Sequence, residues 1–265
     1  MARTDEDLLN EVNRSGFPLQ IAVKRLIEAS DIRSDWSVRY SEHHWQHAST
    51  NREGFIDLVL TQRNGLAEIV LECKRVQNTE WIFLSEAGIP DTTITRGLLS
   101  LNGPPRAVHG WTDCEAILSS PESEFCVAIG EDPKAPRAML ERWAASVVES
   151  CEALAAEDTQ YRFVGLNANP VRVYFPAIVT TASLKKCAYK PDDLAIDSGT
   201  LADAVMTDLP FVRFRKQMSA TPSEVRAPEL GVRPFEVARA KESTVFVINV
   251  TRLLHFLRYL EVHEL

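Results

Sequence analysis

The stretch that decides the fold is Gly54-Phe-Ile-Asp-Leu-Val-Leu-Thr-Gln-Arg-Asn-Gly-Leu-Ala-Glu-Ile-Val-Leu-Glu-Cys-Lys74. Apolar residues flank the dipeptide Asn64-Gly65 on both sides, and Asn-Gly is the strongest short-range signal of a β-hairpin. If these two residues form the centre of a type I′ turn, Arg63 pairs with Leu66. Each step back along the first strand then matches one step forward along the second. The sequence therefore predicts a hairpin with a defined register.

This register places two carboxylates face to face. Asp57 lies directly opposite Glu72, with Cβ atoms about 4.5–5.5 Å apart, and like charges at this separation repel each other unless a cation lies between them. Alternation of side chains along the second strand sends Lys74 to the same face as Glu72, whereas Cys73 points to the opposite, apolar face. The pattern indicates a metal site made by two acids with a lysine beside them.

The spacing of these residues resembles a known family. Asp57, fourteen intervening residues and then Glu72-Cys73-Lys74 resemble the catalytic core of the PD-(D/E)XK nuclease superfamily, which has the restriction-endonuclease-like fold. A helix precedes that core in the family, and the segment Gly16-Phe-Pro-Leu-Gln-Ile-Ala-Val23 is similar to the opening of that helix. The resemblance covers residues 16–84 most closely and is weaker over 137–181.

The resemblance implies that Asp57, Glu72 and Lys74 are catalytic. Asp57, Glu72 and the backbone carbonyl of Cys73 would hold Mg²⁺, with Mn²⁺ able to substitute, and the ion would activate water and neutralise charge on the phosphate. Lys74 would position or deprotonate the attacking water, or neutralise the phosphate. The sequence leaves these roles of Lys74 open.

One supporting residue departs from the family pattern. Many relatives carry a glutamate on the helix that completes the metal shell, and Gln20 stands at that position here. An amide oxygen can still bind a metal or a metal-bound water, but it is a weaker ligand than a carboxylate. Either a further acid compensates or metal affinity is reduced. The candidates for the further acid are Glu11, Glu28 and Glu53.

The remaining pattern suggests one α/β domain over 1–265, with a mixed central β-sheet flanked by helices, restriction-endonuclease-like and with insertions. Its core spans 16–84 and 137–260, and a less regular insertion at about 85–135 is rich in Gly, Pro and Ser. The expected elements in chain order are a helix at 18–30, a strand at 36–40, the hairpin at 55–74, a helix at 138–156, strands at 171–181, 211–216 and 244–249, and an amphipathic helix after the last strand.

Composition is that of a globular protein, with 45% hydrophobic and 25% charged residues among 265. The N-terminus lacks an apolar signal segment, and no apolar run is long enough to span a bilayer, so we expect a cytoplasmic protein with no membrane partner. Five cysteines at positions 73, 114, 126, 151 and 187 form no Cys-x-x-Cys pair. They are expected to be buried, reduced thiols.

Charge is unevenly distributed along the chain. Between 113 and 158 there are eleven acids and three bases, a net charge of −8 that equals that of the whole chain. Between 210 and 241 there are seven bases and three acids, which makes this stretch the best candidate for a phosphate-facing surface. Arg213, Arg215 and Lys216 are expected to contact phosphates. The alternative is that this basic strand balances the acidic segment inside the protein.

A cluster of histidines and one tryptophan have side chains that can bind metals or nucleobases. His43, His44 and His47 are too irregularly spaced for a structural zinc motif and lack cysteine partners, so a solvated strand or loop near the site is expected. Trp81 has the chemistry to stack on a nucleobase, but packing in the core is favoured for a tryptophan in an apolar segment.

The leading interpretation is a metal-dependent endonuclease that hydrolyses phosphodiester bonds in DNA, of restriction, repair or anti-phage type. A first alternative is a catalytically silent nuclease-like module that binds nucleic acid or a partner protein; Gln20 favours it, and the intact set Asp57, Glu72 and Lys74 disfavours it. A second alternative is a ribonuclease. A homodimer or a partner protein stays open as well.

Overall fold

The computed structural model describes residues 3–101, 108–130, 139–160, 170–219 and 234–262. Its helices are α1 (Asp5–Arg14), α2 (Phe17–Ala29), α3 (Met139–Asp158), α4 (Pro234–Ala240) and α5 (Leu253–Tyr259), with 3₁₀ turns η1 (Asp31–Ser34), η3 (Pro191–Asp193) and η5 (Val250–Arg252). Its strands are β1 (Trp36–His47), β2 (Arg52–Gln62), β3 (Ala67–Lys74), β4 (Glu80–Glu86), β5 (Thr92–Leu101), β6 (Val108–Ser120), β7 (Glu122–Ser123), β8 (Phe125–Ile129), β9 (Val171–Thr180), β10 (Ser183–Tyr189), β11 (Leu194–Ala195), β12 (Thr200–Leu201), β13 (Val205–Leu209), β14 (Phe211–Gln217) and β15 (Glu242–Asn249).

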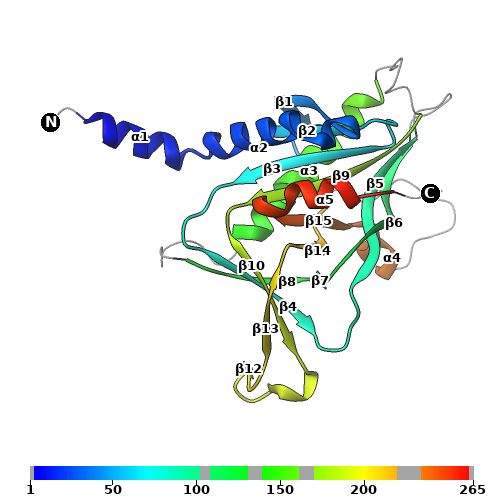
Figure 1. Cartoon of the computed structure of the whole chain (residues 1–265). Helices are drawn as coiled ribbons and strands as arrows, with labels where there is room; N and C mark the ends of the chain where they lie inside the picture. Colours follow the sequence, from blue (N-terminus) through cyan, green and yellow to red (C-terminus); the bar gives the residue numbers. More distant parts are fainter. Residues whose placement is uncertain (1–2, 102–107, 131–138, 161–169, 220–233, 263–265) are drawn as a thin grey trace.

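Among the described residues, the largest sheet has nine strands in the order β1-β2-β3-β9-β15-β14-β7, with β5 joined to β9 and β6 to β5 (Figure 1). The pairs β1–β2 and β2–β3 are antiparallel, whereas β3–β9 and β9–β15 are parallel. A second sheet has the order β13-β10-β4-β8. The predicted fold class, a mixed central sheet flanked by helices, is therefore confirmed at this coarse level.

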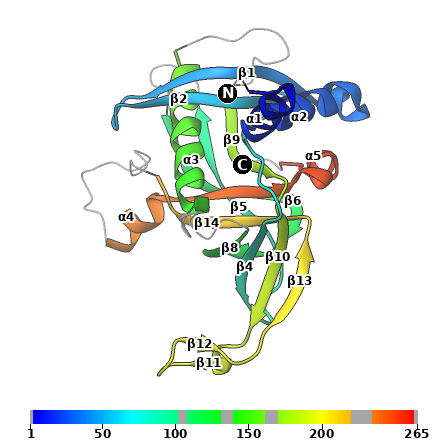
Figure 2. The ribbon, with the colours of Figure 1, turned by 90° about the vertical axis from the view of Figure 1, so that its left-hand side faces the viewer.

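Helices cover both faces of the central sheet, with α3 on one face and α2 and α5 on the other (Figure 2). The cluster on the α2 and α5 face joins these helices to alternate residues of β3, Ile69, Leu71 and Cys73. The cluster on the α3 face includes Val70 of β3. Because β3 is covered on both faces, the consecutive residues Ile69, Val70 and Leu71 are all apolar instead of alternating with polar ones.

The β2–β3 hairpin has the predicted register but not the predicted turn. Its loop comprises the four residues between Gln62 and Ala67, and only Gly65 has a positive φ, of 71°. A type I′ turn needs positive φ at both central residues, so that assignment is wrong. The register survives because a four-residue loop and a two-residue loop centred on the same point connect the strands identically.

The central strand β9 changes its neighbour halfway along. On one side, residues 173–180 pair with β3; on the other, β5 pairs with residues 171–174 and β15 with residues 177–180. The amide of Val173 donates to Leu66 on the β3 side, so alternation directs the nitrogen of Pro176 to the other side. Proline has no N–H to donate, and it stands where β9 has no strand paired on that side.

The segment 85–135, expected to be irregular, contains the four strands β5 to β8 within its described residues. That expectation was wrong. Strand β5 pairs with both β6 and β9. These strands are stabilised by partners distant in sequence, so their own Gly- and Ser-containing composition did not reveal them.

A network of buried charges lies between α3 and strands β1, β3 and β9. Arg39 donates to both oxygens of Asp158, at 2.7 and 2.6 Å, and Tyr174 donates to the same carboxylate at 2.7 Å. Glu68 is fully buried and accepts hydrogen bonds from Arg39 at 3.2 Å and from Thr61 at 2.9 Å. Burial raises the pKa of Glu68 to about 7, although these partners oppose that shift.

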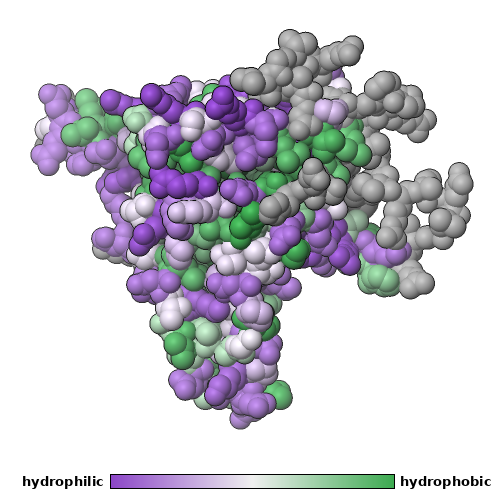
Figure 3. Space-filling view, turned by 45° about the vertical axis from the view of Figure 1, so that its right-hand side comes forward, coloured by the Kyte–Doolittle hydropathy of each residue, from purple (hydrophilic) through white to green (hydrophobic). Residues whose placement is uncertain are grey.

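Two parts of the chain project from this body. Helix α1 has no buried residue, and its apolar residues Leu8, Leu9 and Val12 are 47%, 59% and 54% exposed. The small β11–β12 pair lies at the far end of strands β10 and β13, at the bottom of Figures 1 and 2, whereas α1 extends to the left in Figure 1. Apolar residues show on both projections among mainly hydrophilic neighbours (Figure 3).

Over the described ranges, no helix has the length and apolar character needed to cross a membrane.

Candidate functional site

The hairpin brings together the three residues predicted to be catalytic. Leu58 pairs with Leu71 and the next three pairs follow in step, in the register that the sequence predicts, and Asp57 and Glu72 directly follow the last of these pairs. The ladder between the two strands ends at this level. Beyond it the carboxylate of Asp57 accepts a hydrogen bond from the backbone N–H of Cys73 at 2.6 Å. The acid side chain thus joins the strands where their backbones separate.

The environment of Asp57 is strongly negative. Burial and then the nearby charge of Glu72 raise the pKa of Asp57 to about 7, with a further contribution from Glu42, while the Cys73 amide and Lys74 oppose the shift. This carboxyl group, whose ordinary pKa is 3.8, therefore gains or loses its proton near neutral pH in the folded protein. A cation at this place would relieve the repulsion between the acids.

Lys74 lies beside Glu72 and over an aromatic ring. Its ammonium nitrogen forms an ion pair with the Glu72 carboxylate. The same nitrogen lies 5.4 Å from the ring centre of Trp143 on α3, which is within the range of a cation–π contact. Both side chains are about one quarter exposed, so the pair is open to solvent and to a ligand.

Gln20 reaches this site from the first turns of α2. Its side chain is buried, and its amide nitrogen donates to the backbone carbonyl of Asp57 at 3.0 Å and to the carboxylate of Glu42. The family pattern would use an oxygen at this position as a metal ligand, but the amide group here faces two acceptors. The supporting role predicted for Gln20 remains a prediction, and its observed contacts are those of a donor.

Glu42 is the residue that sequence reasoning missed. It lies on β1 between Ser41 and His43, which pair with Leu58 and Ile56, so it stands opposite Asp57. The negative charge of Glu42 makes a small contribution to the raised pKa of Asp57. The acids considered earlier lie elsewhere: Glu11 pairs with Arg14 at 2.9 Å, Glu28 is exposed, and Glu53 is 3.9 Å from His44. Glu42 was missed because the predicted strand ended at Tyr40.

The protein residues at this place supply only part of the ligand shell that magnesium needs. No three His, Cys, Asp or Glu side chains in the described parts of the chain form a group that could hold a metal ion. Magnesium, however, is usually bound by one or two carboxylates together with waters and substrate phosphates. Asp57 and Glu72 supply two such carboxylates, and the excess of negative charge around Asp57 fits a divalent cation.

Arg213 of β14 cannot make the predicted contact with a phosphate. This side chain is fully buried and donates to Ser120 at 2.6 Å and to the backbone oxygens of Leu118 and Ala116 at 2.7 and 3.3 Å. Burial lowers its pKa to about 10. Arg213 is thus a core residue that joins β14 to the β6 region, and its assignment to nucleic acid was wrong.

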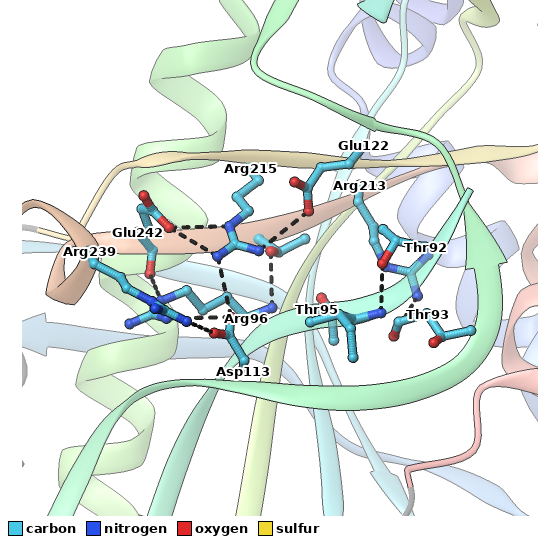
Figure 4. A network of polar contacts seen from close by, with 12 residues as sticks. Thr92, Thr93, Thr95, Arg96, Asp113, Glu122, Arg213, Arg215, Arg239 and Glu242 are labelled. Atoms are coloured by element: carbon cyan, nitrogen blue, oxygen red, sulfur yellow. Dashed lines mark hydrogen bonds and ion pairs between the residues drawn. The ribbon is translucent and has the colours of Figure 1, made fainter. Parts of the chain in front are cut away.

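Arg215 and Lys216 pair with acids of the same chain. Arg215 lies among Glu242, Asp113 and Glu122, with distances of 3.0, 3.3 and 3.6 Å (Figure 4). Lys216 lies 3.4 Å from Glu141 on α3. Asp113, Glu122 and Glu141 all belong to the acidic segment 113–158. The contacts match the alternative in which the basic strand balances this segment internally.

The histidines of β1 connect this strand to α3. His47 is 6% exposed and lies 3.0 Å from Glu152, and His43 lies 3.1 Å from Glu157. A solvated position was expected for the cluster; it holds for His44, whose side chain is 55% exposed, and it is wrong for His47. Sequence alone could not reveal these contacts, because the acidic partners lie more than a hundred residues away.

The expectations for the tryptophan and the cysteines are confirmed. Trp81 is 1% exposed and packs with its ring centre 5.7 Å from that of Trp143. The cysteines are all free thiols, buried except for the partly buried Cys126.

Comparison of the chain with protein-family models, with curated protein sequences and with solved structures gave no match.

Proposed function

We propose that this chain is a metal-dependent endonuclease with a restriction-endonuclease-like core, acting on DNA. The observation that carries the proposal is the opposition of Asp57 and Glu72 at the point where β2 and β3 separate, with Lys74 beside them. The order of elements supports it: helix α2, the antiparallel strands β1, β2 and β3, helix α3, and β9 parallel to β3. This is the order that the resemblance implies.

In this proposal Asp57, Glu72 and the backbone carbonyl of Cys73 hold Mg²⁺. When bound, the ion would make water nucleophilic near neutral pH and would offset the charge that develops on the phosphate. The ammonium of Lys74, held by Glu72, donates a hydrogen bond to a non-bridging phosphate oxygen and orients the phosphodiester toward the attacking water. Trp143 shields one side of this ammonium from solvent.

The alternative is a catalytically silent module. It is favoured by the ion pair between Lys74 and Glu72, which satisfies both groups without a metal, and by the lack of a three-residue ligand group among the described residues. A silent module would bind nucleic acid or protein without requiring a divalent cation. The two functions therefore differ in metal dependence.

The test is cleavage of supercoiled, linear and single-stranded DNA, and of RNA, with Mg²⁺, Mn²⁺ or EDTA. We expect cleavage of DNA with either metal and none with EDTA, and we expect Asp57→Asn and Lys74→Ala to reduce the rate by at least about 100-fold. Asp208→Asn is the matched control, because Asp208 is 85% exposed and pairs with Lys185 on the second sheet. Cleavage of RNA alone would assign a ribonuclease, and no cleavage with no metal binding would assign the silent module.

A further inference from the structure

The loop between β2 and β3 contains a reactive pair of residues, Asn64 and Gly65. Asn64 is exposed, and Gly65 follows it with a φ of 71°. In an Asn-Gly pair the backbone nitrogen of the glycine can attack the side-chain carbonyl carbon of the asparagine and close a five-membered ring. Because glycine has no Cβ to shield this nitrogen, the attack meets less steric hindrance than it would before any other residue.

The side chain of Asn64 is held in a state that favours this attack. The backbone N–H of Leu66 donates to the side-chain oxygen Oδ1 of Asn64 at 2.9 Å, which makes an Asx turn. Nucleophilic attack on the carbonyl carbon places negative charge on Oδ1, and a donor already aimed at this oxygen stabilises that charge. Since Asn64 is exposed, water reaches the ring once it has formed.

One hydrogen bond opposes the reaction. The N–H of Gly65 donates to the carbonyl oxygen of Gln62 at 2.8 Å, and this bond must open before the nitrogen can attack. It lies outside the ladder between β2 and β3, whose last pair before the loop is Thr61 with Glu68. Opening the loop therefore leaves the hairpin paired, and the protein does not have to unfold in order to react.

We propose that Asn64 is a site of spontaneous modification, at which the folded protein converts asparagine to aspartate and isoaspartate. The Gly65 nitrogen bonds to Cγ of Asn64 and gives up its proton, the bond from Cγ to the side-chain nitrogen breaks, and ammonia leaves. Water then opens the succinimide ring. Opening at Cγ gives aspartate, whereas opening at the main-chain carbonyl carbon gives isoaspartate, whose main chain runs through Cγ.

The reaction consumes one water and releases one ammonia for each asparagine converted, and its reactants are the chain itself and water. It does not rest on the proposed function. Isoaspartate adds a carbon atom to the main chain of the loop between Gln62 and Ala67, so the product alters the turn that joins the two strands of the hairpin.

The experiment incubates the folded full-length chain at neutral and at mildly alkaline pH and follows each asparagine by peptide mass spectrometry. An isoaspartate methyltransferase with a labelled methyl donor identifies the isoaspartate. We expect aspartate and isoaspartate at position 64, and we expect them to form faster at the higher pH because the attacking nitrogen must lose its proton.

Asn51 is the internal control. It is also exposed, with a positive φ of 54°, in the turn between β1 and β2, but Arg52 follows it in place of a glycine. It should therefore keep its amide in the same sample. Asn64→Gln is the matched variant: attack on its side chain would close a less favourable six-membered ring, so this variant should show no conversion at position 64.

A synthetic peptide of residues 58–71, which contains the same pair without the fold, sets the time scale. The chain has a second such pair, Asn102-Gly103, outside the described residues, and the peptide map reports it separately. If Asn64 stays intact in the folded chain after the synthetic peptide has converted completely, or converts no faster than Asn51, the folded turn protects it and the inference is overturned.

Discussion

Two acids of the β2–β3 hairpin have pKa values raised to about 7, and they differ in what surrounds them. The pKa of Asp57 is raised by burial and by the charges of neighbouring carboxylates, which leaves excess negative charge around it. The pKa of Glu68 is raised mainly by burial, and the charges of Arg39 and Arg172 oppose this shift. The first environment favours a cation, whereas the second already contains two guanidinium groups. Function is therefore proposed at Asp57, and Glu68 belongs to the packing between the sheet and α3.

Glu68 predicts a pH dependence of stability. Its ordinary pKa is 4.5 and its folded value is about 7, so between these values the folded protein holds a proton that the unfolded chain has lost. The free energy of unfolding should fall as pH rises through this window, and Glu68→Gln should remove that part of the fall. Relative to wild type, the variant should gain about 1–3 kcal/mol between pH 5 and pH 8.

Urea unfolding at pH 5 and pH 8 measures this difference. Asp57 contributes a slope of the same sign over the same window, so the variant should keep part of the pH dependence. Asp208→Asn, at an exposed acid, should behave as the wild type. Parallel behaviour of Glu68→Gln and wild type at the two pH values would show that Glu68 is ionised in the folded protein.

At this scale, the sequence predicted residues whose partners are local and missed those whose partners are distant. Asp57 and Glu72 belong to one hairpin, so a turn signal and alternation sufficed to bring them together. Glu42 depends on how far β1 extends, which its own residues do not reveal. Arg213 was assigned to the surface because arginine is rarely buried, and its hydrogen-bond acceptors lie almost a hundred residues before it.

The junction on β9 is the main feature at the scale of elements. Strand β5 leaves β9 beside Tyr174 and β15 joins it at Ala177, with Pro176 between the two. Gly97 on β5 passes so close to β9 that an added Cβ would lie 2.7 Å from Val173 and 2.9 Å from Phe175. The close approach requires a residue without a side chain, since both contacted residues are fully buried.

Gly97→Ala should therefore destabilise the protein by about 1–3 kcal/mol, the usual cost of overpacking a core. Thermal or urea unfolding measures the loss. Gly54→Ala is the comparison, because its added Cβ would meet the Trp45 ring at 3.1 Å, a contact that a smaller shift relieves. If the two variants lose equal stability, the tight packing of β5 on β9 is not what excludes a side chain at 97.

The elements that periodicity predicted are those that form around their own apolar pattern. Helices α2 and α3 and strands β9, β14 and β15 were all expected near their observed positions. Strands β5 to β8 were not, because Gly97 and the polar residues around it suit a strand only when β9 and β6 lie on either side. Composition alone favours an irregular segment there.

At the scale of the molecule, charge is balanced internally between segments far apart in sequence. The acidic stretch 113–158 meets the basic strand β14 through Asp113, Glu122 and Glu141, and meets β1 through Glu152 and Asp158. A net charge read from a segment therefore says little about the field at the surface, because its partners can lie inside the same chain. The basic residues Arg215 and Lys216 therefore did not indicate a phosphate-binding surface, because acids of the same chain pair with them.

Helix α1 contributes little to the stability of this body. It buries no residue, and a helix of ten residues is marginal on its own in water. Deleting residues 1–14 should leave the melting temperature within about 2 °C of wild type and should leave divalent-metal binding unchanged. Calorimetric scanning and Mn²⁺ titration of the shortened chain check both outcomes. A larger loss of stability would mean that α1 supports α2, and through it Gln20.

The pairing of β3 with β9 sets a delay during synthesis. Lys74 and its partner Thr180 are 106 residues apart, and in the described part of the chain β9 is the strand that pairs with that edge of β3. At a translation rate of about 5–20 residues per second, the β2–β3 hairpin waits roughly 5–20 s with an apolar edge open to other nascent chains. The strand that carries Glu72 and Lys74 therefore keeps one edge unpaired until β9 has been synthesised.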